Sequence, residues 1–171
     1  MEITIRYAKK EDSETISNIY ASSWKIAYKG IVPEKYLSEL SNDFWASNFI
    51  DWITTSKMKV KLISAYNIVV GAIAYGNSRD EKYPRYGEII SFYLYPDYYR
   101  RGLGTMLIDS AIKDIIKDGY KNCFLWVLAE NKSARKFYEN HGFKCTPDLF
   151  YIDIMGKQLT DIRYVLDLVR V

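Results

Sequence analysis

The sequence predicts one domain of the α/β or α+β class, over residues 1–171, in which helices cover a central sheet. Short runs with alternating apolar residues interleave along the chain with longer runs whose apolar residues recur every three or four positions. In the second half the expected order is strand, helix, strand, helix, which is typical of a layered fold. No repeat, low-complexity segment or flexible linker interrupts these patterns, so we expect a single core.

The first half is expected to begin with a strand, continue with helices and return to strands. In chain order the elements are a strand over 3–7, a helix that starts at Asp12 or Ser13 and stops at Gly30, a short helix opened by Pro33, a helix from Asn42 or Asp43, and strands over 60–66 and 68–75. Asp12 or Ser13 can serve as a helix N-cap, and Pro33 suits a first helical residue. Asn67 tolerates the positive φ that a tight reversal between the two strands requires.

The second half carries the alternating strand and helix pattern. The elements are a loop over 76–85, a strand over 88–95, a helix over 102–117, a strand over 123–128, a helix over 131–140, and two final strands around 150–154 and 162–169. The run from Cys123 to Leu128 is apolar throughout, which predicts a central position in the sheet.

The composition excludes several classes of protein. The net charge is only +3, and the sequence lacks the clustered basic residues of a nucleic-acid-binding surface. No apolar run approaches the roughly 20 residues that span a bilayer. The first residues do not resemble a secretory signal. We therefore expect an intracellular, cytoplasmic protein with no nucleic-acid or membrane partner.

One histidine and two cysteines argue against a metal site. Cys123 and Cys145 lie in apolar sequence and are expected to be small buried side chains. His141 precedes Gly142 at the end of the last expected helix. We expect Gly142 to be a left-handed cap and His141 to belong to the helix end rather than to a catalytic site.

The most informative segment covers residues 94–105, where a strand ends, two glycines flank a leucine and a helix begins. Gly102 and Gly104 let the backbone approach a ligand closely and present N–H groups to it. The helix N-terminus adds unpaired donors and a partial positive charge, and Arg100 and Arg101 add full charges. The spacing fits neither a dinucleotide-binding motif nor a P-loop. The segment therefore predicts an anion site, with a glycine-rich turn and two solvated arginines as the alternative.

Two segments of the second half resemble the GNAT acetyltransferase superfamily. Residues 88–97, followed by Arg-Arg-Gly-Leu-Gly and a leucine-containing helix, resemble its cofactor-binding segment, and residues 131–143 resemble its Asn…Ala…Phe-Tyr…Gly-Phe segment. The run 24–33 is similar to some bacterial branches, one of which includes polyamine-acetylating enzymes. The resemblance implies a mixed, mostly antiparallel sheet of about seven strands that splays between strands four and five. It also implies acetyl-CoA as co-substrate, without a metal.

The resemblance implies which residues would hold the cofactor. Backbone groups of Phe92, Tyr93 and Leu94 would pair with its pantetheine arm, with the N–H of Phe92 polarising the acetyl carbonyl, and Asn131 would bond to the same arm. The pyrophosphate would lie on the turn formed by Arg100, Arg101, Gly102, Leu103, Gly104 and Thr105. Tyr99 stands where the family pattern has Gln or Arg, a departure that leaves the backbone donors unaffected.

Tyr138 is the candidate general acid. Asn131 and Tyr138 are seven positions apart on the expected helix, so they face the same direction as the small Ala134. The resemblance implies that Tyr138 protonates the departing sulfur, which a hydroxyl with a pKa near 10 can do at neutral pH. A core tyrosine on an amphipathic helix is the alternative.

Glu88 is the candidate base. It lies fourteen residues before Gly102, the spacing at which histone-modifying relatives place a catalytic glutamate. Alternation would put Glu88 on one strand face with Ile90, Phe92 and Leu94, and apolar neighbours there would raise its pKa toward the working range of a base. The alternatives are a solvated residue at the start of a strand, with an ordered water or another carboxylate as the base.

Trp24 and Tyr28 share one face of the first helix. They could form a wall of the acceptor pocket, where aromatic faces bind an ammonium group, or simply pack the helix on the sheet. The expected function is transfer of an acetyl group to a primary amine: a polyamine, an amino acid, a drug or a protein amine. The alternative is a non-catalytic CoA-binding regulatory module on the same fold. The many tyrosines and the long final strand would suit a homodimer.

Overall fold

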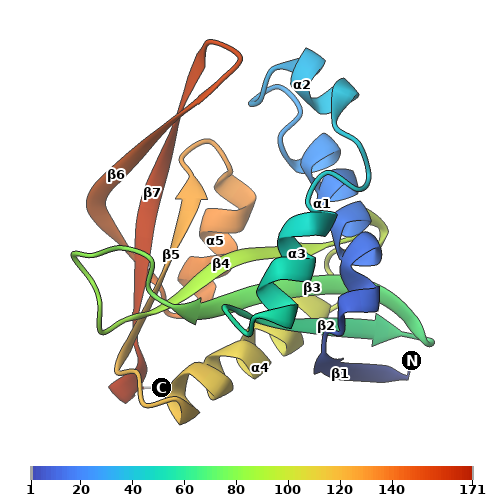
Figure 1. Cartoon of the computed structure of the whole chain (residues 1–171). Coiled ribbons are helices and arrows are strands. Elements are labelled where there is room, and N and C mark those ends of the chain that lie inside the picture. Colours follow the sequence, from blue (N-terminus) through green and yellow to red (C-terminus); the bar gives the residue numbers. More distant parts are fainter. Residues whose placement is uncertain (1, 171) are drawn as a thin grey trace.

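The computed structural model describes residues 2–170 and contains, over that range, one sheet of seven strands with helices on both faces (Figure 1). The strand order is β1-β2-β3-β4-β5-β7-β6. Neighbouring strands are antiparallel except for β4 and β5, which are parallel. The prediction of a mixed, mostly antiparallel sheet with flanking helices is confirmed.

The observed elements follow the predicted order closely. They are β1 (Ile3–Tyr7), α1 (Ser13–Ala27), α2 (Glu34–Glu39), α3 (Ala46–Thr54), β2 (Lys59–Ala65), β3 (Ile68–Asn77), β4 (Gly87–Leu94), α4 (Leu103–Lys117), β5 (Asn122–Leu128), α5 (Lys132–Asn140), β6 (Lys144–Ile154) and β7 (Lys157–Asp167). One-turn 3-10 helices lie at Lys10–Asp12, Pro96–Tyr98 and Leu168–Arg170. Among these elements, no helix has the length and apolar character that crossing a bilayer requires.

The helices divide between the two faces of the sheet (Figure 1). On one face α1 and α3 pack on β2 and β3 through a buried cluster that includes Ile16, Ile19, Phe49, Leu62 and Ala72. On the other face α4 and α5 pack through a larger cluster that includes Leu107, Ile108, Ile115, Leu125 and Tyr138. The sheet is therefore buried on both sides at its centre, which explains the continuous apolar runs of its central strands.

Two predicted details of the first half need correction. The helix expected from Asn42 or Asp43 starts at Ala46, because the Trp45 backbone N–H donates to Ser17 Oγ at 3.0 Å and the chain turns before the helix begins. Asp12 does not cap α1 with its side chain, since its carboxylate accepts two hydrogen bonds from Arg6 at 2.7 and 2.8 Å.

The last two strands are longer than predicted. They form one hairpin, β6–β7, whose turn residues Met155 and Gly156 both have positive φ values of 52° and 82°. Cys145 lies at the start of β6, an edge strand that is locally irregular, and is exposed rather than buried as expected. Cys123, in the central strand β5, is buried as predicted.

The predicted splay between the fourth and fifth strands is present. Only three residue pairs join β4 to β5, the last being Ile89 with Leu125. At this point β4 contains a β-bulge: Ser91 pairs with Ala74 of β3 and Ile89 pairs with Tyr75, so Ile90 has no partner. Because a bulge bends its strand and increases the local twist, β4 leaves β5 from here on (Figure 1).

The bulge also reverses the alternation of side chains along β4, which overturns the predicted face of Glu88. Phe92 and Leu94 pack with the α4 core, as Ile89 does, whereas Tyr93 packs on the opposite side with residues of α1. Glu88 precedes the bulge and neighbours Ile89, so it lies on the Tyr93 side of the sheet. It does not share a face with Phe92 and Leu94.

Gly87 lets α4 approach the short paired part of β4 and β5. It pairs with Cys123 of β5, and a Cβ atom added to Gly87 would lie 2.6 Å from Ile115 Cγ2 of α4. Such a distance is far inside ordinary van der Waals contact, so any side chain here must displace the helix or the strand.

We expect Gly87→Ala to lower the free energy of unfolding by about 1–3 kcal/mol, because the core is already filled at this position. In an Ile115→Ala background the same substitution should cost less, since the opposing methyl group is gone. Urea denaturation of the four proteins of this double-mutant cycle measures both costs. Equal costs in the two backgrounds would show that close approach of α4 is not the reason for the glycine.

Candidate active site

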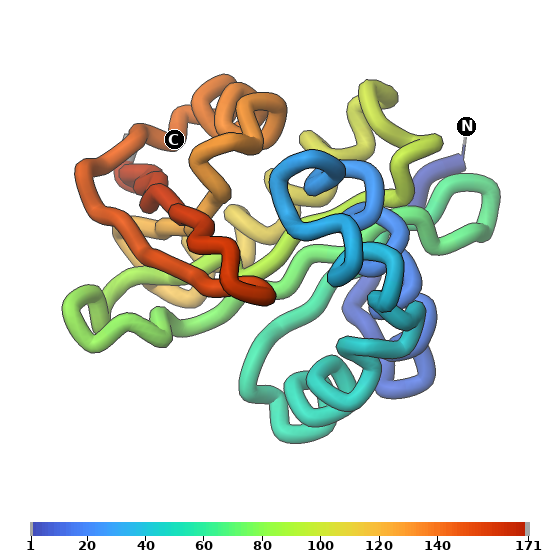
Figure 2. Tube along the Cα trace, turned by 90° about the horizontal axis from the view of Figure 1, so that it is seen from above, coloured from blue at the N-terminus to red at the C-terminus, as the bar shows by residue number. Residues whose placement is uncertain are grey.

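The splay opens into a large cleft that runs through the sheet. The cleft has a volume of about 1440 Å³ and is lined by α1, β4, β5, α5, the β6–β7 hairpin and the loop between β3 and β4. The hairpin reaches the segment after α1 (Figure 2), where Lys157 Nζ donates to the carbonyl oxygen of Ile31. Contact between these two segments closes one end of the cleft.

Most of the predicted site residues line this cleft. They are Trp24, Tyr28, Glu88, Phe92, Tyr93, Leu94, Arg100, Gly102, Gly104, Thr105, Asn131 and Tyr138. Two predicted residues do not line it with their side chains: Leu103 is 1% exposed in the α4 core, and the Arg101 guanidinium lies 5.2 Å from the centre of the Tyr98 ring. Their backbone amides belong to the same turn.

The turn before α4 is built to present backbone N–H groups. Arg100 and Gly102 both have left-handed backbone conformations, with φ values of 58° and 78°, and Gly102 is the residue that precedes the helix. No side chain caps α4, and the N–H groups of a first helical turn have no acceptor within the helix. A Cβ atom at Gly102 would meet no atom within 4 Å. The donors therefore face open space at the positive end of the helix dipole, which favours an anion.

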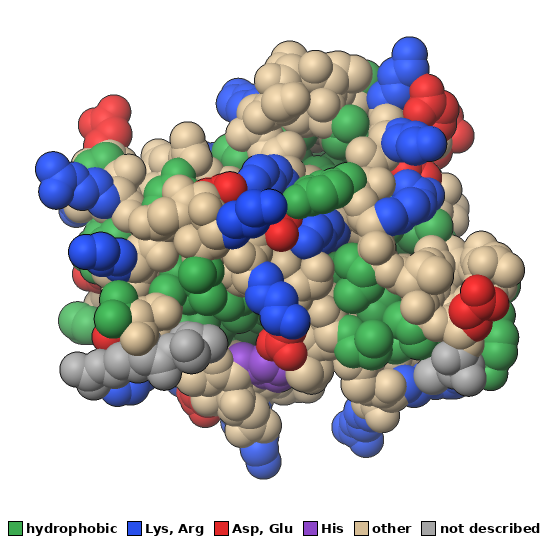
Figure 3. Space-filling model, turned by 90° about the horizontal axis from the view of Figure 1, so that it is seen from below, with side chains coloured by type: hydrophobic (Ala, Val, Ile, Leu, Met, Phe, Trp, Pro, Cys, Tyr) green, Lys and Arg blue, Asp and Glu red, His purple; other side chains and the backbone are tan. Residues whose placement is uncertain are grey.

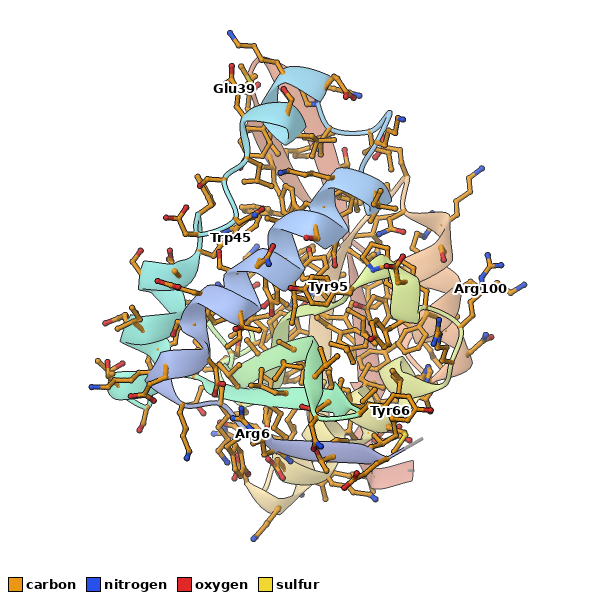
Figure 4. All side chains as sticks on the ribbon, turned by 90° about the vertical axis from the view of Figure 1, so that its right-hand side faces the viewer. Arg6, Glu39, Trp45, Tyr66, Tyr95 and Arg100 are labelled. Carbon is orange, nitrogen blue, oxygen red and sulfur yellow. The ribbon has the colours of Figure 1, made fainter. Side chains whose placement is uncertain are left out.

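Charged side chains around the turn differ in their freedom. Arg100 is exposed and extends outward from the turn (Figure 4), whereas Arg101 stacks on Tyr98. Arg135 of α5 donates from Nε to Tyr164 Oη and from NH1 to the carbonyl of Ala129, both at 3.0 Å. Of these cations, Arg100 is the one without a partner among the described residues.

His141 links the two helices that border the turn. Gly142 has a φ of 85°, so the predicted left-handed cap of α5 is confirmed. The His141 ring additionally binds the Phe137 carbonyl through Nδ1 at 2.7 Å and Thr105 Oγ1 of α4 through Nε2 at 3.2 Å. The carbonyl requires a proton on Nδ1, so in a neutral ring Nε2 accepts from the Thr105 hydroxyl.

Asn131 and Tyr138 stand at the two ends of the cleft wall formed by α5. Asn131 is the N-cap, and its Oδ1 accepts the Ala134 N–H at 3.1 Å, which leaves its side-chain NH₂ free to donate. Tyr138 is 9% exposed, and its hydroxyl makes no hydrogen bond within residues 2–170. Burial, and secondarily the neighbouring Tyr93, raise the pKa of Tyr138 well above 10, so the hydroxyl carries its proton at neutral pH.

The edge of β4 beyond the bulge is open to the cleft. The Tyr95 N–H donates to Val70 of β3 at 2.8 Å, while the Leu94 carbonyl points the other way and accepts from Ser23 Oγ of α1 at 2.5 Å. Because successive residues of a strand direct their N–H groups to opposite sides, the N–H groups of Phe92 and Leu94 point away from β3. They face the space that β5 has vacated.

The prediction that apolar groups surround Glu88 is wrong, because an arginine binds its carboxylate. It is 2% exposed, and its carboxylate accepts hydrogen bonds from Arg79 NH2 at 2.6 Å, from Arg79 Nε at 3.2 Å and from the Arg79 backbone N–H at 2.9 Å. No pattern in the sequence indicated this partner, because Arg79 lies in the loop before β4 and reaches Glu88 by folding back along the strand.

Trp24 and Tyr28 pack the core, as one interpretation of this pair predicted, and they also line the cleft, while their role in an acceptor pocket stays a prediction. Their rings meet edge to face with centres 4.7 Å apart, and Tyr28 Oη lies 2.9 Å from Tyr93 Oη of β4. Burial raises the pKa of Tyr93 to about 12 and raises the pKa of Tyr28 well above its ordinary value. Both hydroxyls are therefore neutral and polar in an aromatic chamber.

Two charged residues of β7 were missed by the sequence analysis. Asp161 lines the cleft beside the aromatic chamber, and burial raises its pKa to about 6. Arg163 is 3% exposed, with its guanidinium 3.8 Å from the Tyr83 ring centre and 2.5 Å from Asp80 Oδ2, so it holds the β3–β4 loop against the sheet. The predicted strand began at residue 162; an earlier start would have shown Leu159, Asp161 and Arg163 alternating onto one face.

Comparison with known proteins agrees with this geometry. The profile of the Acetyltransferase (GNAT) family matches residues 16–143. An uncharacterized N-acetyltransferase of Bacillus subtilis, YuaI, is 27% identical over 94% of this chain and 90% of its own length. A spermidine N(1)-acetyltransferase of Thermoplasma acidophilum is 29% identical over 84% of this chain and 89% of its own length.

Among solved structures, the PaiA N-acetyltransferase of Thermoplasma acidophilum in complex with coenzyme A has a TM-score of 0.78 and 26% identity, over 98% of this chain and 99% of that one. An N-acetyltransferase of Staphylococcus aureus has the same fold, with a TM-score of 0.77 and 21% identity over 98% of this chain and 99% of that one. The chain belongs to the acetyltransferase (GNAT) family and is an acyltransferase.

Proposed function

We propose that the protein transfers the acetyl group of acetyl-CoA to the primary amine of a small molecule, by direct attack of the amine on the thioester. The observation that carries the proposal is the single cleft that joins an anion-binding turn, an open strand edge and a buried tyrosine hydroxyl. The relative crystallised with coenzyme A supports the choice of cofactor. Acetyl-CoA supplies an acyl group activated as a thioester.

The residues of the turn and of β4 would hold this co-substrate. The N–H groups from Arg101 to Thr105 suit a diphosphate, and the space beside Gly102 leaves room for it. The open N–H and carbonyl groups of β4 and the free side-chain amide of Asn131 suit the amide groups of a pantetheine arm. The side chain of Arg100 is exposed to solvent and has no partner among the described residues, so it could bind another phosphate group of the co-substrate.

Two groups would act on the reacting atoms. The N–H of Phe92 faces the cleft and would stabilise the oxygen that becomes negative during attack, which is worth about 3 kcal/mol for one such donor. Tyr138 would donate its proton to the departing sulfur. Glu88 stays a candidate base, but it would first have to release the guanidinium of Arg79, which occupies both of its oxygens.

The acceptor is proposed to be a small amine that carries its positive charge into an aromatic chamber walled by Trp24 and Tyr28. The spermidine-acetylating relative supports a polyamine as one such amine. On the face seen in Figure 3, Lys and Arg side chains are scattered among acidic and apolar ones, which gives no field for a nucleic acid. The homodimer and the cytoplasmic location expected from the sequence stay predictions.

Substituting Gly102 by Val should abolish the heat of CoA binding in calorimetry, because the side chain would stand where the diphosphate must approach. Gly119→Val is the matched control: Gly119 also has a positive φ, of 91°, also has no atom within 4 Å of an added Cβ, and lies at the opposite end of α4. Both variants carry similar backbone strain. Loss of CoA binding in both variants, or in neither, would contradict the assignment of the turn.

Tyr138→Phe should lower kcat on the order of 10²-fold, since a general acid contributes at least that much, and should leave CoA affinity nearly unchanged. Tyr151→Phe, at an exposed tyrosine of β6, controls for loss of a hydroxyl. Release of the CoA thiol is followed with a panel of spermidine, tyramine and benzylamine. Unchanged turnover in Tyr138→Phe would remove the acid from the mechanism. A wild-type protein that binds CoA but releases no thiol with any amine would be a regulatory module instead.

A further inference from the structure

We infer that Asp161 is the group that receives the acceptor's ammonium in the cleft and takes its first proton. This inference rests on the proposed acetyl transfer and names the partner that the acceptor meets on its own side of the cleft. It assigns to β7 a role that the sequence pattern had given to Glu88 of β4. The arguments are the position of Asp161, the missing counter-charge and the chemistry of the chamber.

Asp161 lies at the centre of the half of the sheet that faces β4 across the cleft. Its strand neighbours are Leu128 of β5 and Phe150 of β6, both of which also line the cleft. The opposite wall carries the hydroxyl pair of Tyr28 and Tyr93. Leu159, two residues before Asp161 on β7 and therefore on the same strand face, is buried in one cluster with Tyr28 and Leu128, and Tyr93 packs against that cluster, so Asp161 lies on the face of β7 that carries these contacts. Tyr138 lines the same cleft, so the carboxylate and the proposed acid border one space.

Among the cleft carboxylates that the structure describes, Asp161 and Glu81 lack a cation, and of these two Glu81 is exposed whereas Asp161 is partly buried. Glu88 pairs with Arg79 at 2.6 Å, and Arg163 lies 2.5 Å from Asp80 and 3.5 Å from Asp148. For Asp161 the described residues provide neither an ion pair nor a hydrogen bond to the carboxylate, and burial is the sole cause of its shifted pKa. A partly buried carboxylate without a partner loses hydration without compensation, so this position is destabilising unless a ligand supplies the positive charge.

The surroundings of Asp161 suit an ammonium group of a ligand rather than a metal ion. Trp24, Tyr28 and Tyr93 present aromatic faces and neutral hydroxyls, which together stabilise a partly desolvated ammonium. Within residues 2–170, no group of three or more acidic, cysteine or histidine side chains forms a metal cluster. The ligand class is therefore a primary alkylammonium on a largely apolar or aromatic arm that can lie along β5 and β6.

The amine nitrogen loses two protons during the reaction, and both are accounted for. The bound R–NH₃⁺ gives one proton to the Asp161 carboxylate and becomes a neutral amine. The nitrogen attacks the thioester carbon, so that a C–N bond forms and the C–S bond breaks. Tyr138 gives its proton to the sulfur and is reprotonated by the second proton that the nitrogen loses. The products are the N-acetyl amine and the CoA thiol, and Asp161 returns its proton to water.

The pH dependence of the reaction should report Asp161. The groups that face it are Tyr28 from α1 and Tyr93 from β4, both neutral below pH 10, while Leu128 and Phe150 do not titrate; Arg163 lies two residues along β7 and is held by Asp80. Because the acidic form of Asp161 can neither bind nor deprotonate an ammonium, kcat/KM should fall below about pH 6, near the raised pKa.

The test compares Asp161→Asn with Glu88→Gln and with Glu81→Gln, an exposed cleft carboxylate that serves as the matched control. With spermidine, tyramine and benzylamine at pH 7, we expect Asp161→Asn to lower kcat/KM on the order of 10²-fold or more. Its rate should recover as the pH rises toward the pKa of the free amine, because solution then supplies the neutral form. The control Glu81→Gln should keep the wild-type profile.

A purely structural role for Asp161 predicts a different set of results. Its folded-state pKa lies above the unfolded value, so its charge destabilises the protein above about pH 6, and Asp161→Asn should not lower the melting temperature at pH 7. A lowered melting temperature with a wild-type pH profile, or a loss of the acid limb in Glu88→Gln rather than Asp161→Asn, would overturn the inference. Wild-type protein that releases no thiol with any amine would overturn the proposed function and this inference together, whereas active Asp161→Asn would overturn the inference alone.

Discussion

The separation of β4 from β5 is the constraint on which the rest of the structure depends. Three residue pairs hold these two strands together, and the bulge at Ile90 then turns β4 away. In the interior of a sheet such a gap leaves backbone donors and acceptors without partners, which is costly unless something else satisfies them. Ser23 of α1 satisfies the carbonyl of Leu94 at one end of the gap. The remaining open groups are the reason why the cleft suits a ligand that carries its own amide groups.

The bulge also sorts chemistry between the two faces of the sheet. Phe92 and Leu94 direct their side chains to the α4 side, where the turn at Gly102 and the N-terminus of α5 gather hydrogen-bond donors. Tyr93 directs its side chain to the α1 side, where the carboxylate of Asp161 has no partner among the described residues. A donor-rich end suits an anionic cofactor and a carboxylate-bearing end suits a cationic acceptor, so the two proposed substrates would be separated by charge before they meet near Tyr138.

How much of this could be predicted depended on how local each feature is in the sequence. The turn at Gly102 and the Asn131–Tyr138 pair were predictable, because each is formed by neighbouring residues within one loop or one helix. The pairing of Glu88 with Arg79 was not, since it requires the loop before β4 to fold back along the strand. One unpaired residue, Ile90, was enough to move Glu88 to the opposite face, because side chains alternate with a period of two. Single bulges of this kind leave no clear mark in the hydrophobic pattern.

The roles of Asp161 and Arg163, on the other side of the cleft, also could not be predicted from neighbouring residues in the sequence. Both lie on β7, in the interior of the sheet, yet one charge is neutralised and the other is not: Arg163 is enclosed by Tyr83, Phe124 and Trp126 and bound to Asp80. The arginine therefore contributes to folding by fixing the loop that borders the cleft. The charged aspartate opposes folding, because burial costs it hydration and no partner compensates. A partly buried charge that opposes folding is a local conflict of the kind expected at functional sites. The difference between these two neighbouring charges is the strongest reason to seek the acceptor's ammonium at Asp161.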